Sequence, residues 1–210
     1  MGSAKLELVG STQLQPAQSR PDKGERQQVA AVCFRLLSTG IEFLLVQTRQ
    51  NRWTFAKGGL QSGLTQAQSA ALEAYEEAGV DGRIEETSFA QYRLRKTGQR
   101  EPRQAQSVVH AHLCEVSRLG KPEEINRNPT WFAPTKAKRR LAEGRTSENS
   151  AELARILDQA VTRIRRLSGR TLNDRGALIK VSFENPAASP SDAVPRRKIL
   201  ELSRVHPDRP

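Results

Sequence analysis

The chain has 210 residues, of which 36% are hydrophobic and 27% charged, and it carries a formal net charge of +11 at pH 7. No apolar run approaches the roughly 18 residues of a membrane span, and the first residues lack the apolar stretch of a signal peptide, so we expect a cytoplasmic protein without a membrane partner. The low hydrophobic content favours one folded domain of about 140 residues with polar tails.

The first part of the chain predicts a polar arm followed by a hairpin. Residues 1–27 are polar and contain two prolines, which favours a disordered N-terminal arm. The apolar runs 28–37 and 41–47 flank a Ser-Thr-Gly sequence, which is a hairpin signal. Residues 53–55 then predict a short strand that enters a glycine-rich loop.

The middle of the chain predicts further strands. Residues 82–96 and 104–116 both alternate apolar and polar side chains, which is typical of strands half-buried in a sheet. The polar segment 97–102 between them predicts an exposed tip.

The last third predicts two helices and a tail. Residues 135–144 have helical composition, and residues 150–167 carry an apolar stripe at helical spacing. Prolines and small polar residues predict that 169–210 is a mostly disordered basic tail. Within it, residues 178–183 are strand-like and are a candidate for an added strand at the sheet edge. The predicted folded domain therefore covers residues 28–168.

Three carboxylates cluster on one predicted helix. Residues 69–78 are good helix formers, and Gly79 follows them as a helix-terminating residue. Glu73, Glu76 and Glu77 have the spacing that places side chains on one helix face. Because like charges repel, either a divalent cation such as Mg²⁺ or Mn²⁺ lies against them or the face is solvated.

The sequence before this helix favours the cation. It reads W-T-F-A-K-G-G over residues 53–59. Glycines let the backbone approach a ligand closely, and Lys57 offers a positive charge for a phosphate group. This arrangement predicts chemistry on a pyrophosphate.

The segment resembles the signature of the Nudix hydrolases, G-x5-E-x7-R-E-U-x-E-E-x-G-U, in which U is a bulky apolar residue. The positions that match are Gly58, Glu73, Glu76, Glu77, Gly79 and Val80. Three depart: Leu64 replaces a glutamate, Leu72 an arginine that normally braces a neighbouring glutamate, and Ala74 a bulky residue. The resemblance implies an α+β fold, the Nudix α/β/α sandwich with a mixed β-sheet.

The resemblance also implies a Mg²⁺- or Mn²⁺-dependent hydrolase that cleaves a pyrophosphate linkage. Glu73 and Glu77 are expected to be the principal metal ligands, with Glu76 in a supporting role. The backbone carbonyl of Gly58 is expected to complete the coordination.

The resemblance leaves the base open. Either Glu73 or a carboxylate from the loop before residue 131 would take that role, and Glu123 and Glu124 are the loop candidates. A solvated position is an equal alternative for these two. Lys57 is expected to contact a phosphate group of the substrate.

The subgroup that the helix sequence resembles cleaves dinucleoside polyphosphates and diphosphoinositol polyphosphates, which are therefore the favoured substrates. The alternatives are a nucleotide-sugar or RNA-cap pyrophosphatase, or a catalytically weak Nudix domain that senses a nucleotide or nucleic acid. Arg93, Arg95 and Arg100 cluster around the predicted hairpin and would attract a polyphosphate. A solvated surface or a nucleic-acid partner is the less favoured interpretation.

Cysteine and histidine do not extend the predicted site. Cys33 and Cys114 lie in apolar strand-like runs, which favours two reduced core thiols. His110 and His112 share one strand face without a third metal ligand at suitable spacing, so we expect ordinary sheet residues.

Overall fold

The computed structural model describes residues 26–95, 106–169, 178–183 and 199–204. Its helices are α1 (Gln66–Ala78), α2 (Pro134–Ala142) and α3 (Ser147–Gly169). Its strands, in chain order, are β1 (Arg26–Leu37), β2 (Gly40–Gln47), β3 (Trp53–Thr54), β4 (Ala56–Gly59), β5 (Val80–Glu85), β6 (Ala90–Arg95), β7 (Gln106–Leu119), β8 (Thr130–Phe132), β9 (Leu178–Phe183) and β10 (Ile199–Arg204).

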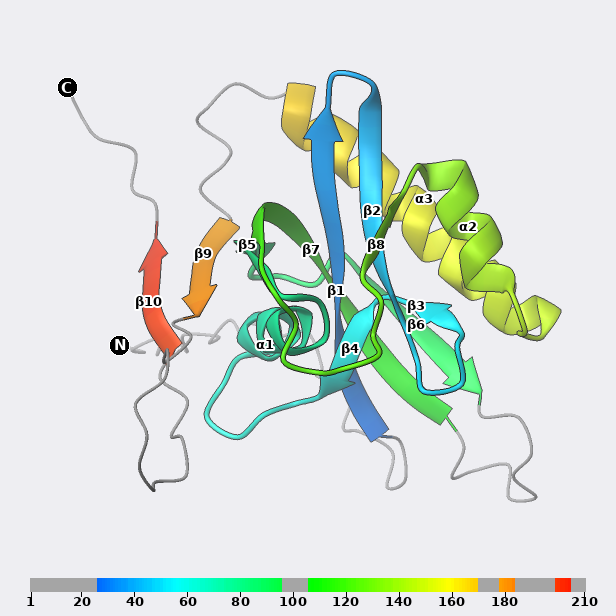
Figure 1. The fold of residues 1–210 in the computed structure, drawn as a ribbon, viewed down its shortest axis with the longest axis horizontal. Helices are drawn as coiled ribbons and strands as arrows, with labels where there is room; N and C mark the ends of the chain where they lie inside the picture. Colours follow the sequence, from blue (N-terminus) through cyan, green and yellow to red (C-terminus); the bar gives the residue numbers. More distant parts are fainter. Residues whose placement is uncertain (1–25, 96–105, 170–177, 184–198, 205–210) are drawn as a thin grey trace, which may run out of the picture.

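The described strands form a 10-stranded mixed sheet (Figure 1). Its order is β10-β9-β5-β7-β1-β2-β3, while β4 pairs with β1, β6 with β7 and β8 with β2. The central pair β1 and β7 is parallel, and the other pairs are antiparallel. The predicted hairpin is confirmed, because β1 and β2 close with Leu37 opposite Gly40.

Helices cover both faces of this sheet (Figure 1). Successive strand residues point to opposite faces, so β1 contributes to two separate cores. Val29 and Ala31 pack on the α1 side. Ala30 and Val32 pack on the side of α2 and α3. The predicted α/β/α sandwich is therefore confirmed.

The middle strands differ from the half-buried pattern that the sequence predicted. The predicted strand 82–96 is divided in two within the described residues, since β5 ends at Glu85 and β6 begins at Ala90. In β7, neighbouring side chains from Val108 to Cys114 are nearly all buried. The physical reason is its central place, because α1 contacts β7 on one face and the α3 core contains alternate β7 residues on the other.

The thiol and histidine predictions agree with this central position. Cys33 and Cys114 lie opposite each other in the β1–β7 pair, and both are free and buried. His112 is fully buried, with Nδ1 3.0 Å from the carbonyl oxygen of Glu85. An ordinary sheet role is consistent with that contact.

Local sequence explains the helix ends. Thr65 caps α1, accepting the Gln68 backbone N–H while the Gln68 side chain accepts the Thr65 N–H. Gly79 ends α1 in the left-handed conformation at φ 69°. Both later helices are confirmed, and α3 begins three residues before the predicted start.

The tail contributes to the sheet. The segment 178–183, which the sequence predicted to be strand-like, is β9. It adds to the sheet beside β5, with which it pairs antiparallel. The adjacent β10 was not predicted. At the other end, β1 begins at Arg26, so residues 26 and 27 belong to a strand instead of the predicted arm. The rest of both predicted tails, and the tip 97–102, lie outside the described residues.

No helix in the described part of the chain is long and apolar enough to cross a membrane.

Candidate metal and substrate site

The acidic face of α1 is buried. Glu73 and Glu76 are each 8% exposed and Glu77 is 3% exposed. This excludes a merely solvated acidic helix face. Carboxylates removed from water require compensating positive charge or hydrogen bonds, so the surroundings of these three side chains decide what the site can do.

Gly58 on β4 lies directly against the Glu73 carboxylate. A Cβ atom added at position 58 would overlap the carboxylate carbon and both oxygens of Glu73. Gly58 pairs with Val29 of β1, whose side chain packs on the α1 face, so the strand register turns this face of β4 toward α1. The structure therefore brings together two of the residues predicted to bind metal.

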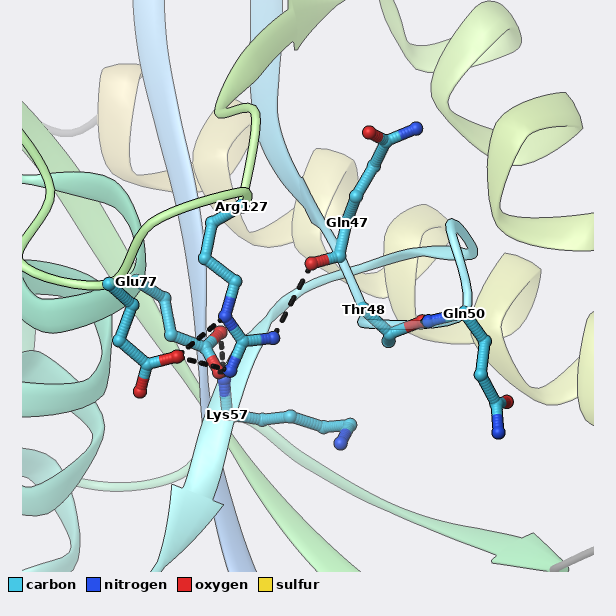
Figure 2. A network of polar contacts seen from close by, with 7 residues as sticks. Gln47, Thr48, Gln50, Lys57, Glu77 and Arg127 are labelled. Carbon is cyan, nitrogen blue, oxygen red and sulfur yellow. Dashed lines mark hydrogen bonds and ion pairs between the residues drawn. The ribbon is translucent and has the colours of Figure 1, made fainter.

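Glu77 is held at both carboxylate oxygens. Its Oε2 accepts the backbone N–H of Lys57 at 3.3 Å, and its Oε1 lies 2.7 Å from Nη2 of Arg127 (Figure 2). Burial raises the pKa of Glu77 to about 7, even though the Arg127 guanidinium acts in the opposite direction. The negative charge of Glu73 raises it further.

The loop between β7 and β8, residues 120–129, is tied to α1. The backbone N–H of Glu124 donates to the carbonyl of Glu76 at 2.8 Å, and that of Gly120 donates to the carbonyl of Gly79 at 2.7 Å. Arg127 also pairs with the Glu124 carboxylate through Nη2 and Nε, each at 2.7 Å. The predicted loop residue Glu124 thus reaches the carboxylate cluster.

Glu123 is exposed on the same loop. Together with Glu124 it lines a hollow of about 790 Å³ between the β7–β8 loop and the β2–β3 turn. Whether either acts as the base stays a prediction.

The Lys57 side chain lies on the other side of β4. Its cross-strand partner is Ala30, which belongs to the core under α2 and α3, and Figure 2 shows the side chain extending away from the Glu77 carboxylate. Burial lowers the pKa of Lys57, the negative charge of Glu77 opposes this, and the charges of Arg127 and Arg145 lower the pKa further. Lys57 therefore belongs to a cationic region behind the carboxylate cluster.

Arg145 is the second cation of that region. It lies in the turn between α2 and α3, and its guanidinium donates to the backbone carbonyls of Leu141 at 2.7 Å and Trp53 at 2.6 Å. Within the described part of the chain, no carboxylate forms an ion pair with Arg145. Within the described residues, the buried hydroxyls of Thr54 and Tyr92 have no hydrogen-bond partner. These features suit an anionic or polar group of a ligand.

The predicted basic hairpin is described only in part. Arg93 lies beside Glu152 of α3, whose pKa is lowered mainly by Arg155 and further by Arg93. The carboxylates, by contrast, project from α1 on the opposite face of the sheet. Arg95 ends β6, and Arg100 lies outside the described residues. Substrate binding by these arginines stays a prediction.

Arg127 and Arg145 are the residues that sequence reasoning missed. Each is a single arginine in a short connection, and neither has a local pattern that distinguishes it from a solvated surface residue. The only sequence signal was indirect. Leu72 stands where the resemblance places an arginine, and it is 8% exposed, so any bracing cation had to come from another segment.

The donor set fits a hard divalent cation by its chemistry. Buried carboxylates beside glycine backbone are ligands that Mg²⁺ and Mn²⁺ prefer. Even so, no three His, Cys, Asp or Glu side chains in the described ranges converge closely enough to hold a metal ion as they stand. The guanidinium of Arg127 lies between Glu77 and Glu124 instead.

Comparison with known families agrees with this geometry. The model of the NUDIX domain matches residues 26–153, which include α1, β4 and the β7–β8 loop. The chain belongs to the Nudix family. No curated protein matches the sequence.

Solved Nudix structures share the fold. An Ap4A hydrolase from C. elegans in a binary complex has 22% identity and a TM-score of 0.51, covering 69% of this chain and 99% of that one. A putative NUDIX hydrolase from Listeria monocytogenes has 14% identity and a TM-score of 0.52, covering 68% and 97%. The NUDIX domain of Shewanella oneidensis NrtR, complexed with ADP ribose, has 16% identity and a TM-score of 0.51, covering 71% and 94%.

Proposed function

We propose that this Nudix pyrophosphohydrolase uses Mg²⁺ or Mn²⁺ to cleave a pyrophosphate linkage in a nucleoside-diphosphate-type or polyphosphate substrate. Dinucleoside polyphosphates and diphosphoinositol polyphosphates are the favoured substrates. The observation that carries the proposal is the burial of three carboxylates on α1, one of them packed on the backbone of Gly58. Buried clustered carboxylates are costly unless a cation compensates them.

Glu73 and Glu77 would hold the metal, with Glu76 in support and the carbonyl of Gly58 completing the set. When bound, the metal supplies charge neutralisation at the phosphate oxygens and activation of a water molecule. The chain's own contribution is to hold these oxygens in place. The Lys57 backbone N–H fixes one oxygen of Glu77, and the close packing on Gly58 fixes the carboxylate of Glu73.

A carboxylate oxygen at the edge of the cluster would accept the proton of the attacking water. Glu73 and the loop residues Glu123 and Glu124 are the candidates. A further observation supports Glu124 as the base, since its backbone is hydrogen-bonded to α1, which keeps the residue near the carboxylate cluster. A base has to lie within hydrogen-bond reach of the water whose proton it takes.

The remaining substrate charge would meet the cations behind β4. Lys57 and Arg145 are partly buried, and the Arg145 guanidinium donates to two neutral backbone carbonyls, which favours an anionic group beside these cations. The exposed arginines of the predicted hairpin, Arg93, Arg95 and Arg100, would attract a polyphosphate over a longer range.

The test is hydrolysis by the full chain with Mg²⁺ across a panel of phosphorylated compounds. The panel contains a dinucleoside tetraphosphate, a diphosphoinositol polyphosphate, a nucleotide sugar and a capped RNA, with products identified by chromatography. Glu77→Gln should lower turnover of the best substrate by about 100-fold or more, because it removes a charge on which transition-state stabilisation depends. Glu42→Gln, which alters a half-exposed pair with Arg35, is the matched control and should retain full activity.

Two results would contradict the proposal. One is a Glu77→Gln variant that keeps near-normal activity with the fold intact, and the other is a wild-type chain that cleaves no member of the panel.

A catalytically weak Nudix domain that senses a nucleotide or nucleic acid is the second candidate function. The observation that favours it is the ion pair between Glu77 and Arg127, which engages a predicted metal ligand. Calorimetry with nucleotides and with single-stranded RNA separates the two functions. Binding without turnover supports the sensor, and salt-sensitive RNA binding assigns the basic surface to nucleic acid.

A further inference from the structure

We propose that Arg127 is an internal counter-cation of the carboxylate cluster, and that a divalent metal binds Glu77 by displacing its guanidinium. The inference rests on the proposed function, since it concerns the same metal site. It assigns a role to a residue of the β7–β8 loop that lies outside the Nudix motif.

The position of the guanidinium is that of a bridging cation. A single nitrogen, Nη2, lies 2.7 Å from Glu77 Oε1 and 2.7 Å from Glu124 Oε2, and Nε lies 2.7 Å from the same Glu124 oxygen. Figure 2 shows the guanidinium directed into the space between α1 and the loop. A metal that binds Glu77 needs carboxylate oxygens that the guanidinium and the Lys57 N–H already engage.

The backbone and side chain of Arg127 are both held by contacts with the end of β2. The carbonyl of Arg127 accepts the backbone N–H of Gln47 at 2.6 Å, so the loop is anchored on the end of β2. Nη1 of Arg127 lies 3.4 Å from the carbonyl of Gln47 (Figure 2). The side chain of Arg127 is 17% exposed, less than either partner in the surface pair of Arg35 and Glu42. The guanidinium is thus held by the fold and compensates charge that α1 buries.

Both cations cannot bind the cluster at full strength. Mg²⁺ takes oxygen ligands at about 2.0 to 2.1 Å, which is shorter than the 2.7 Å that separates the guanidinium nitrogen from Glu77. Two positive charges that share these oxygens repel strongly in a region screened from water. Metal binding therefore requires the guanidinium to withdraw.

Space for that withdrawal is available. Arg127 itself lines the hollow of about 790 Å³ between its loop and the β2–β3 turn. The side chain can turn into this hollow while its backbone stays hydrogen-bonded to Gln47.

The experiment measures Mg²⁺ affinity by isothermal titration calorimetry of the full chain at pH 8.5. This pH lies above the pKa of Glu77 in the wild-type chain, which is about 7, and the same pH is used for every variant. We expect Arg127→Gln to bind Mg²⁺ on the order of tenfold more tightly than wild type, because a competing positive charge is gone. Arg83→Gln is the matched control, since Arg83 pairs with Glu115 at 2.7 Å away from the cluster, and it should leave the affinity unchanged.

Further variants locate the effect. Glu77→Gln added to Arg127→Gln should abolish the gain in affinity. Arg127→Lys, which keeps the charge but cannot donate to two carboxylates from a planar fork, should bind Mg²⁺ with intermediate affinity. This variant also keeps the proposal testable if Arg127→Gln fails to fold, as judged by circular dichroism.

The outcomes separate this inference from the proposed function. If wild type binds Mg²⁺ and neither Arg127 variant binds it more tightly, the inference is wrong and Arg127 is a brace for Glu77. If no protein in the series binds Mg²⁺, the metal site of the proposed function fails and the inference fails with it.

Discussion

The absence of a side chain at Gly58 determines where the Glu73 carboxylate lies. We expect Gly58→Ala to lower turnover by about 100-fold, because its Cβ would displace the carboxylate and a misplacement near 1 Å has an effect of that order. Steady-state kinetics on the best substrate measure this, with the melting temperature recorded for each variant.

Gly59→Ala is the matched control for Gly58→Ala. A Cβ at Gly59 would meet no atom within 4 Å, although the residue is next in the same strand. Equal effects of the two substitutions on turnover would show that Gly58 has no special relation to Glu73.

At the scale of the element, the end of α1 packs closely against the loop that carries Glu124 and Arg127. Gly79 has φ 69°, and a Cβ there would overlap the carbonyl of Gly120, whose N–H donates back to the carbonyl of Gly79. We expect Gly79→Ala to lower the free energy of unfolding by about 3 kcal/mol, since backbone strain and overpacking add. Denaturant unfolding measures it.

Gly63→Ala separates strain from packing. Gly63 also has a positive φ, 80°, but a Cβ there would meet nothing within 4 Å. This variant should cost about 1 kcal/mol, from the left-handed conformation alone. If both glycine variants unfold at the same denaturant concentration, the contact between α1 and the loop contributes nothing to stability.

At the scale of the whole molecule, the tail and the site lie at different parts of the sheet. β9 extends the sheet beyond β5, whereas Gly58 lies on β4, which pairs with β1. We expect removal of residues 170–210 to lower the melting temperature by at least about 3 °C, because β5 loses its ladder partner. The exposed edge should also promote association, visible by light scattering.

The same truncation should leave KM for a small substrate unchanged. Removal of residues 205–210 alone, which spares β9 and β10, is the control and should not change the melting temperature. A full truncation that melts like the intact chain would mean that the β5–β9 pair adds no stability.

The sequence by itself determined the features that depend on neighbours along the chain. The spacing of Glu73, Glu76 and Glu77, the terminating Gly79 and the apolar stripe of α3 are local patterns with helical period, so they predicted helices and a shared acidic face. The Nudix motif added the family and the expected α/β/α sandwich. The hairpin of β1 and β2 followed from a turn between two apolar runs.

Only the tertiary structure decided which distant groups meet. The strand order buries β7 on both faces and pairs β9 with β5. The local alternation of side chains identifies neither the central place of β7 nor the partner of β9. Register sends Lys57 to the opposite side of β4 from Gly58. The ion pair between Arg127 and Glu77 joins a loop to a helix that is far from it in the sequence. A single arginine has no periodic pattern from which its partner can be predicted. Such long-range contacts depend on how the whole sheet assembles.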